Sequence, residues 1–162
     1  MPPVTRLPAG QLMDAIQNGR YPFWYPDSAK GLAIEYFVFG TDFTPLNAGA
    51  TATQSISITG DAAFIVLSAV LVLTDTTNLV FLSNRPLLAD IGEGGSGRHL
   101  SNTPIHVNNW FGTAEEPKYW DVPRLLAPNT NMNVQMQNLD AANARNVRVA
   151  FHGFKIYGFT PK

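Results

Sequence analysis

Much of the chain after residue 31 alternates between apolar and polar positions with a period of two. Between residues 50 and 59, threonine and serine occupy one face, and Ile56 and Ile58 occupy the other. Between residues 132 and 137, methionine and valine alternate with asparagine and glutamine. This alternation is typical of β-strands that have one buried face. We therefore predict half-buried strands in both segments.

Longer apolar runs predict further strands. Residues 62–73 form the longest run and are rich in β-branched side chains, so we expect a central, buried strand there. Residues 147–157 are expected to close the chain as a long strand, bent at Gly153. Residues 110–124 are expected to be irregular, because a glycine and two prolines interrupt them. Shorter apolar stretches predict strands at 32–39, 79–83, 87–91 and 105–107.

These segments amount to about eight strands and almost no helix. Eight antiparallel strands with loops of uneven length predict an all-β fold, an antiparallel β-sandwich that is jelly-roll-like. We assign this sandwich to residues 32–162. Residues 1–31 are expected to form a separate, extended N-terminal arm.

The arm differs from the rest of the chain in its prolines and aromatic residues. It holds five prolines, and only residues 11–17 have a pattern that suits a short helix. Because prolines favour extended neighbours, we expect a stiff aromatic segment. The arm either caps the domain's own core or reaches a neighbouring subunit, where aromatic side chains supply much of the binding energy. On the second interpretation its interface residues are Tyr21, Phe23, Trp24 and Tyr25.

Charge is scarce and evenly spread. Charged residues make up only 14% of the chain and the net charge is -1, whereas soluble domains average roughly 25% charged residues. A weakly charged surface repels neighbours little, so we expect a homo-oligomer, a dimer or trimer. No basic stripe is present, and we expect no nucleic-acid partner. No apolar run is long enough to span a membrane, and no apolar leader follows Met1, so we expect no membrane partner.

No motif indicates catalysis or a bound cofactor, and we expect the protein not to be an enzyme. Gly92, Gly94 and Gly97 match a dinucleotide fingerprint, but no helix is predicted after them, so a surface loop is the better interpretation. Glu115 and Glu116 are adjacent, and on an extended chain adjacent side chains point to opposite sides. We therefore assign no catalytic residue, no cofactor and no small-molecule ligand.

Histidines are the remaining candidates for metal binding. His99 and His106 are close enough in sequence to meet across a loop, and Asp90 is a carboxylate that could join them. Their spacing matches no established zinc pattern, so we expect no metal. His152, next to Gly153 in the last strand, is expected to be structural.

A second group of aromatic residues lies near the middle of the chain. These residues either cover one end of the sandwich or form a contact surface, on which sugar rings could stack. The possible contact residues are Trp110, Phe111, Tyr119 and Trp120.

The order of these segments resembles that of small structural proteins of tailed bacteriophages. The likeness runs from about residue 20 and is one of composition and order rather than of a single motif. It rests on Phe23-Trp24-Tyr25-Pro26, on residues 48–58 and 61–64, on Trp110-Phe111-Gly112-Thr113, on Pro128-Asn129-Thr130 with the polar strand 131–138, and on residues 147–156.

The resemblance implies a virion protein, made in the host cytoplasm, that decorates and stabilises an assembled capsid as a cement protein. Its implied partners are further copies of itself and a major capsid or other virion protein. Two alternatives stay open. One is a neck, collar or baseplate component with the same fold, and the other is a carbohydrate-binding fibre module. The resemblance implies no catalytic residues.

Overall fold

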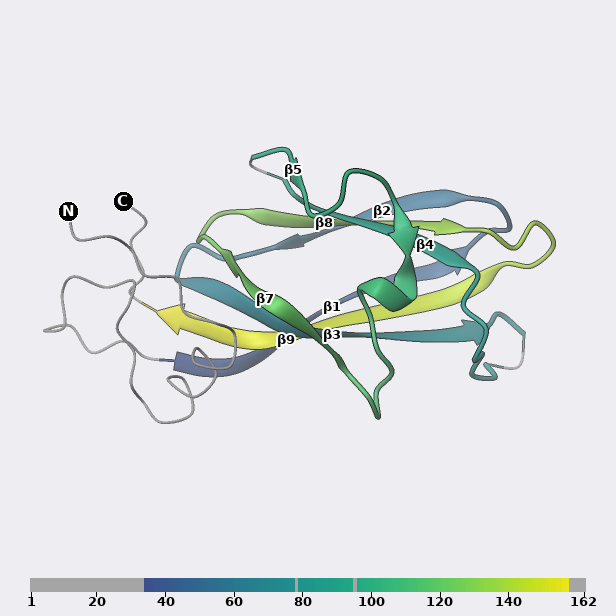
Figure 1. Cartoon of the computed structure of the whole chain (residues 1–162), viewed down its shortest axis with the longest axis horizontal. Coiled ribbons are helices and arrows are strands. Elements are labelled where there is room, and N and C mark those ends of the chain that lie inside the picture. The colour runs from purple at the N-terminus through teal and green to yellow at the C-terminus, as the bar shows by residue number, and fades with distance from the viewer. Residues whose placement is uncertain (1–33, 78, 95, 158–162) are drawn as a thin grey trace, which may run out of the picture.

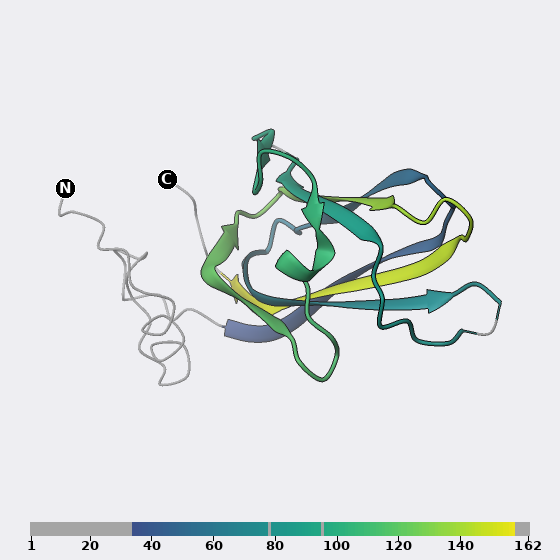
Figure 2. The same cartoon turned by 45° about the vertical axis from the view of Figure 1, so that its right-hand side comes forward.

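A computed structural model of the chain describes residues 34–77, 79–94 and 96–157. These residues form nine β-strands and one short 3₁₀ helix, and the strands make two sheets that pack face to face (Figure 1). A view turned by 45° shows the same two layers (Figure 2). The all-β sandwich predicted from the alternation is confirmed.

The chain alternates between the two sheets. The four-stranded sheet has the order β1 (Ile34–Leu46), β9 (Arg145–Tyr157), β3 (Ala62–Asp75) and β7 (Lys118–Leu126). In the other sheet β2 (Thr51–Ser57), β8 (Asn131–Asn138) and β4 (Leu87–Glu93) are neighbours, and both β5 (Arg98–His99) and β6 (Ile105–His106) pair with β4. The helix η1 (Val107–Asn109) follows β6. With β5 and β6 counted as one position, the chain changes sheet after every strand except β4. This is the connectivity of a jelly roll.

The core lies between the two inner faces. Met132, Val134 and Met136 of β8 are buried there, opposite inward side chains of β3 such as Leu71. Ile56 of β2 is buried in the same cluster. The period-two predictions for residues 50–59 and 132–137 are thus confirmed.

A β-bulge interrupts the pairing of β3 with β9. The register of β3 against β9 shifts between Val66 and Ser68, so Leu67 is the extra residue. Gly153 lies opposite the bulge, and a Cβ atom there would be 1.8 Å from the carbonyl oxygen of Ile65. We expected a bend at Gly153 of β9. The irregularity at this point is instead the bulge in its partner strand β3.

Three strand predictions were wrong. Residues 79–83 form a loop that touches β3 through a single bridge between Thr74 and Phe81. Residues 110–124, expected to be irregular, contain most of β7. Because β7 is an edge strand, Pro123 interrupts no inner ladder. The first strand continues to Leu46 rather than ending at residue 39. The arm, its short helix and its four aromatic residues lie outside the described residues.

Candidate interaction surfaces

Three of the four aromatic residues predicted as a contact surface pack inward. The Trp110 and Trp120 rings are 5.7 Å apart, and the Trp120 indole nitrogen donates to the Trp110 carbonyl oxygen at 3.0 Å. Phe111 is buried and meets Phe151 edge to face. Only Tyr119 of the four projects from the surface, with 63% of it exposed.

An open hollow of about 310 Å³ lies beside Tyr119. Trp110 and Trp120 form part of its lining, together with polar side chains that include Asn109 and Arg124. The hollow thus offers a ring and several hydrogen-bonding groups in one place.

The outer face of the four-stranded sheet is apolar. Ile65 and Leu67 alternate with core residues of β3 and join Ile156 of β9 in a second apolar cluster, against which Leu125 and Phe154 pack. In the described residues, no third layer of strands or helices covers this face. Sandwich strands usually present polar side chains on their outer faces. Ile65, Leu67 and Ile156 are themselves only 1%, 7% and 4% exposed, so the face is a candidate interface only where exposed side chains adjoin this cluster.

The apolar character continues onto the edge strand β1. Tyr36 and Val38 are exposed there, and the Tyr36 ring meets Phe154 edge to face. The Tyr36 hydroxyl forms a hydrogen bond of 2.6 Å with Nδ1 of His152. His152 thus has the structural role expected of it.

The outer face of the other sheet is polar. Thr53 faces Gln135 across the strands, and Ser55 faces Asn133. The alternation that predicted strand β2 therefore places hydroxyl and amide groups on the outer face of this sheet. We call the two surfaces the apolar face and the polar face.

The histidines do not form a metal site in the described part of the chain. His99 Nδ1 lies 2.7 Å from Asp90 Oδ2 on the polar face, whereas His106 accepts a hydrogen bond from the Asn108 amide. No group of three potential ligands is found among the described residues. Gly92, expected in a surface loop, lies in β4 and pairs with His99 of β5, whereas Gly97 lies in the short connection between the two strands. No helix directly follows this connection.

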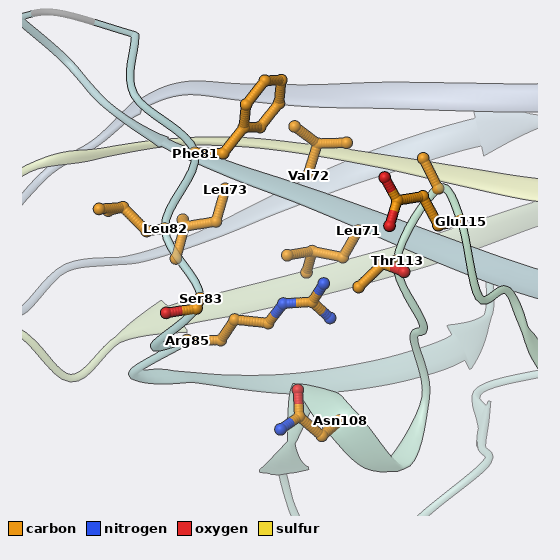
Figure 3. A pocket seen from close by; sticks show the side chains of 11 residues that line it. Leu71, Val72, Leu73, Phe81, Leu82, Ser83, Arg85, Asn108, Thr113 and Glu115 are labelled. Carbon is orange, nitrogen blue, oxygen red and sulfur yellow. The ribbon is translucent and has the colours of Figure 1, made fainter.

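A groove of about 620 Å³ runs beside the second half of β3 (Figure 3). Its walls come from residues 71–73 of β3, residues of the following loop between 81 and 85, Asn108 of η1, and residues 113–115. Glu115 lines one side, and the Arg85 side chain extends along the floor towards Thr113 (Figure 3). The sequence did not identify this groove, because its apolar residues 79–83 were interpreted as a strand. The polar residues 75–78 before this run and residues 84–86 after it are typical of turns, and they could have indicated a loop.

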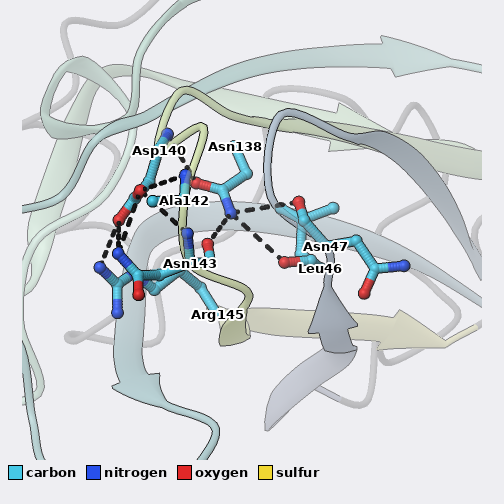
Figure 4. A network of polar contacts seen from close by, with 7 residues as sticks. All are labelled: Leu46, Asn47, Asn138, Asp140, Ala142, Asn143 and Arg145. Carbon is cyan, nitrogen blue, oxygen red and sulfur yellow. Dashed lines mark hydrogen bonds and ion pairs between the residues drawn. The ribbon is translucent and has the colours of Figure 1, made fainter.

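A network of hydrogen bonds and an ion pair links the β1–β2 turn to the β8–β9 loop (Figure 4). The buried Asn138 amide donates to the carbonyl oxygens of Leu46, Asn47 and Asn143 at 3.3, 3.2 and 2.9 Å. Asp140 accepts from the Ala142 and Asn143 amides and forms an ion pair with Arg145. The network is structural, since its donors and acceptors are directed at one another.

Asp140 is strongly stabilised as a carboxylate. The Ala142 amide, followed by the Asn143 side chain, lowers the pKa of Asp140 from 3.8 to about 2.

In the described residues, no helix is long and apolar enough to cross a membrane.

Comparison with known proteins gives distant likenesses. No family model matches the chain, and no curated protein matches its sequence. Among solved structures, VP2 of infectious bursal disease virus in a subviral particle is similar over 77% of this chain, at 13% identity and a TM-score of 0.32. The Gx strain of that virus matches over 80% of this chain, at 12% identity and a TM-score of 0.31. Dimeric latent PorU from Porphyromonas gingivalis matches over 75%, at 14% identity and a TM-score of 0.27.

The chain spans about a third of the length of the viral chains, 32% and 33%, and 13% of PorU. Likeness of this extent assigns neither a family nor a function to the chain.

Proposed function

We propose that the protein is a virion structural component that decorates an assembled capsid and stabilises it through subunit contacts. The observation that supports this most is the apolar face, where exposed side chains of edge strand β1 adjoin the buried cluster of Ile65, Leu67 and Ile156. Tyr36 and Val38 extend it to the sheet edge. A face of this kind suits a protein that works by burying surface against neighbours.

Decoration stabilises a capsid when the protein binds the assembled lattice better than free subunits. At a free concentration of 100 times Kd, such binding adds about 2.7 kcal/mol per site by mass action. Its partners on this proposal are further copies of itself, as a dimer or trimer, and a major capsid or other virion protein. The aromatic arm is proposed to tether the sandwich to a neighbouring chain.

The test is to find the protein in particles and count it. Mass spectrometry of purified particles should give a copy number that scales with the capsid lattice, and electron cryomicroscopy should show density on the capsid surface. Particles that lack the protein should disrupt at a lower temperature and recover when purified protein is added. Absence from particles would overturn the proposal.

A neck, collar or baseplate position predicts a different count. Such a ring holds a few copies at one site, so a small copy number with density confined to the tail would favour that alternative over decoration.

Glycan binding is the second candidate, and the hollow beside Tyr119 favours it. Exposed aromatic rings flanked by polar groups suit sugar stacking. Replacement Tyr119→Ala should then abolish retention on a glycan array, while Leu139→Ala, a change at an exposed position outside the hollow, should not. If no glycan is retained by the unaltered protein, this candidate fails.

A further inference from the structure

Strand β1 forms one edge of the four-stranded sheet. It pairs with β9 on one side, and in the described residues no strand pairs with its other side. Between residues 34 and 43 the described part of the chain supplies no backbone hydrogen bond to β1 other than those from β9. An edge of this kind presents a row of unpaired amides and carbonyls, with which another chain can pair.

The other edges of the described sandwich are blunted, short or polar. β7 carries Lys118 and Pro123, and its register against β3 shifts, and each of these features opposes pairing with a further chain. β5 and β6 hold two residues each. β2 is an unbroken edge of seven residues, but its exposed positions carry hydroxyls and an amide, which water solvates. β1 is therefore the edge most open to association.

Residues 34–43 of β1 lack the features that protect an edge. They include no lysine, no arginine and no proline. Their two carboxylates have partners on β9, which is the covered side of the strand. Glu35 accepts a hydrogen bond of 2.6 Å from the Tyr157 hydroxyl, and Asp42 accepts two from Arg148, at 2.6 and 3.1 Å.

Apolar side chains occupy both faces of this edge. Tyr36 and Val38 lie on the outer face of the sheet and are 57% and 39% exposed. Phe37 and Phe39 lie on the opposite face, where they are only partly buried against the core and their ring centroids are 4.8 Å apart. If the sheet continued into another chain, side chains on both faces would lose contact with water, which favours association.

The sequence of β1 is complementary to itself when two copies run antiparallel with Val38 at the centre. Each Val38 then faces the other Val38, Tyr36 faces Gly40 of the second copy, and Phe37 faces Phe39. Pairs of aromatic residues, and an aromatic ring beside a glycine, are favourable neighbours across strands. Glu35 faces Thr41, so no two like charges lie opposite each other.

Neighbouring registers fit the sequence less well. With the centre at Phe37, Glu35 would lie opposite Phe39 of the second copy. With the centre at Phe39, Glu35 would lie opposite Phe43. Either register brings a carboxylate out of water against a ring that offers it no hydrogen bond, and this is unfavourable. The register centred on Val38 avoids both contacts.

We propose that β1 pairs with β1 of a second copy of this chain about a two-fold axis at Val38. The two four-stranded sheets then become one continuous sheet, and the apolar face extends across the axis. Such a contact uses the same surface on both copies, so it closes as a dimer. The proposal rests on the self-association included in the proposed function, and it names the surface and the register.

Cysteine cross-linking tests the position of the axis, because the chain contains no cysteine of its own. Val38→Cys places two thiols on residues that face each other, with Cα atoms about 4.5–5.5 Å apart, which a disulfide can bridge. Tyr36→Cys leaves the two thiols about 13 Å apart along the strands, which is beyond its reach. We expect Val38→Cys chains to link on the order of tenfold or more faster than Tyr36→Cys chains, since pairing raises the effective concentration.

A mixture of two variants tests the register. Tyr36→Cys and Gly40→Cys chains should form heterodimers faster than either variant links to itself, because these positions face each other across the axis. Gly40 tolerates a side chain, since a Cβ atom there makes an ordinary contact of 3.5 Å. Thr53→Cys, exposed on the β2 edge, is the control and should link as slowly as Tyr36→Cys.

Three results of the cross-linking would overturn the proposal. The first is an equal rate for Val38→Cys and Tyr36→Cys, which indicates random collision. The second is a Thr53→Cys rate as high as that of Val38→Cys, which assigns the contact to β2. The third is fastest linking of Tyr36→Cys to itself, which moves the axis away from Val38.

Hydrogen exchange of the unaltered protein gives an answer that needs no substitution. Amides of residues 36–41 that do not bond to β9 should exchange on the order of tenfold or more slowly at a concentration that favours the dimer than at high dilution. Exchange that is independent of concentration in this segment would overturn the proposal.

The same measurements separate this proposal from the proposed function. If Val38→Cys chains link specifically but the protein is absent from particles, the pairing of β1 stands and decoration is wrong. If the protein is present on capsids but cross-linking shows no preference for Val38, decoration stands and the pairing is wrong.

Discussion

Gly153 occupies a point where two backbones approach too closely for a side chain. A Cβ atom there would be 1.8 Å from the Ile65 carbonyl oxygen and 2.9 Å from its carbon. Replacement Gly153→Ala must therefore move strand β3 or β9 and break part of their ladder. We expect the free energy of unfolding, measured in urea, to fall by about 3 kcal/mol or more.

Gly40 provides the matched control in the same sheet. A Cβ atom at Gly40 would meet the Val149 carbonyl oxygen at 3.5 Å, an ordinary contact. Replacement Gly40→Ala should change stability by less than about 1 kcal/mol. Equal losses for the two variants would show that the approach at the bulge is not tight.

Asp140 makes the folded state sensitive to acid. Its pKa is lowered from 3.8 to about 2 in the folded chain, so folding favours the carboxylate. The resulting stability is complete above the unfolded pKa and is lost as pH falls from about 4 towards 2. In urea unfolding, Asp140→Asn should be less stable than the unaltered chain at pH 7, and the difference should narrow across that range. Asp121→Asn, an exposed change on β7, should give a curve parallel to that of the unaltered chain.

At the scale of elements, Asn138 couples the β8–β9 loop to the β1–β2 turn. Its side chain is 1% exposed and donates to three carbonyl oxygens. Replacement Asn138→Asp keeps the shape but places an oxygen where those carbonyls need a donor. We expect a loss of about 3 kcal/mol at pH 7, measured by urea unfolding. Asn131→Asp, exposed on the same strand, should cost far less, and a similar loss there would contradict this role.

The pattern of the sequence predicted strands where one face, or both, is buried. Strands β2, β3, β8 and β9 were found because alternation or a long apolar run reflects burial directly. β7 was missed because an edge strand tolerates Pro123 and has no clean alternation.

Exposure was the property that the pattern could not show. The apolar run at 79–83 has the composition of a buried strand, yet Phe81 is mostly exposed. For the same reason Phe111 could be named as a contact residue although it is buried. Which side of a sheet a side chain packs on depends on partners distant in sequence, as with Ile65 and Ile156, which join one cluster.

At the scale of the whole molecule, the sandwich presents two unlike outer faces. The polar face carries hydroxyls and amides such as those of Thr53 and Gln135, which water solvates well. The apolar face carries the Ile65 cluster and continues to Val38 on edge strand β1. A lysine on an edge strand opposes pairing with another chain, and a charge within an apolar contact is costly to bury. The two faces therefore predict opposite responses to an added charge.

We expect the unaltered protein to be a dimer or trimer in light scattering, with the apolar face in the contact. Replacement Val38→Lys should shift it towards the monomer at the same concentration, while its melting temperature changes little, since Val38 is already 39% exposed. Thr53→Lys places the same charge on the polar face and should leave the oligomer intact. Dissociation by Thr53→Lys but not by Val38→Lys would assign the contact to the polar face, and a monomeric unaltered protein at high concentration would contradict self-association altogether.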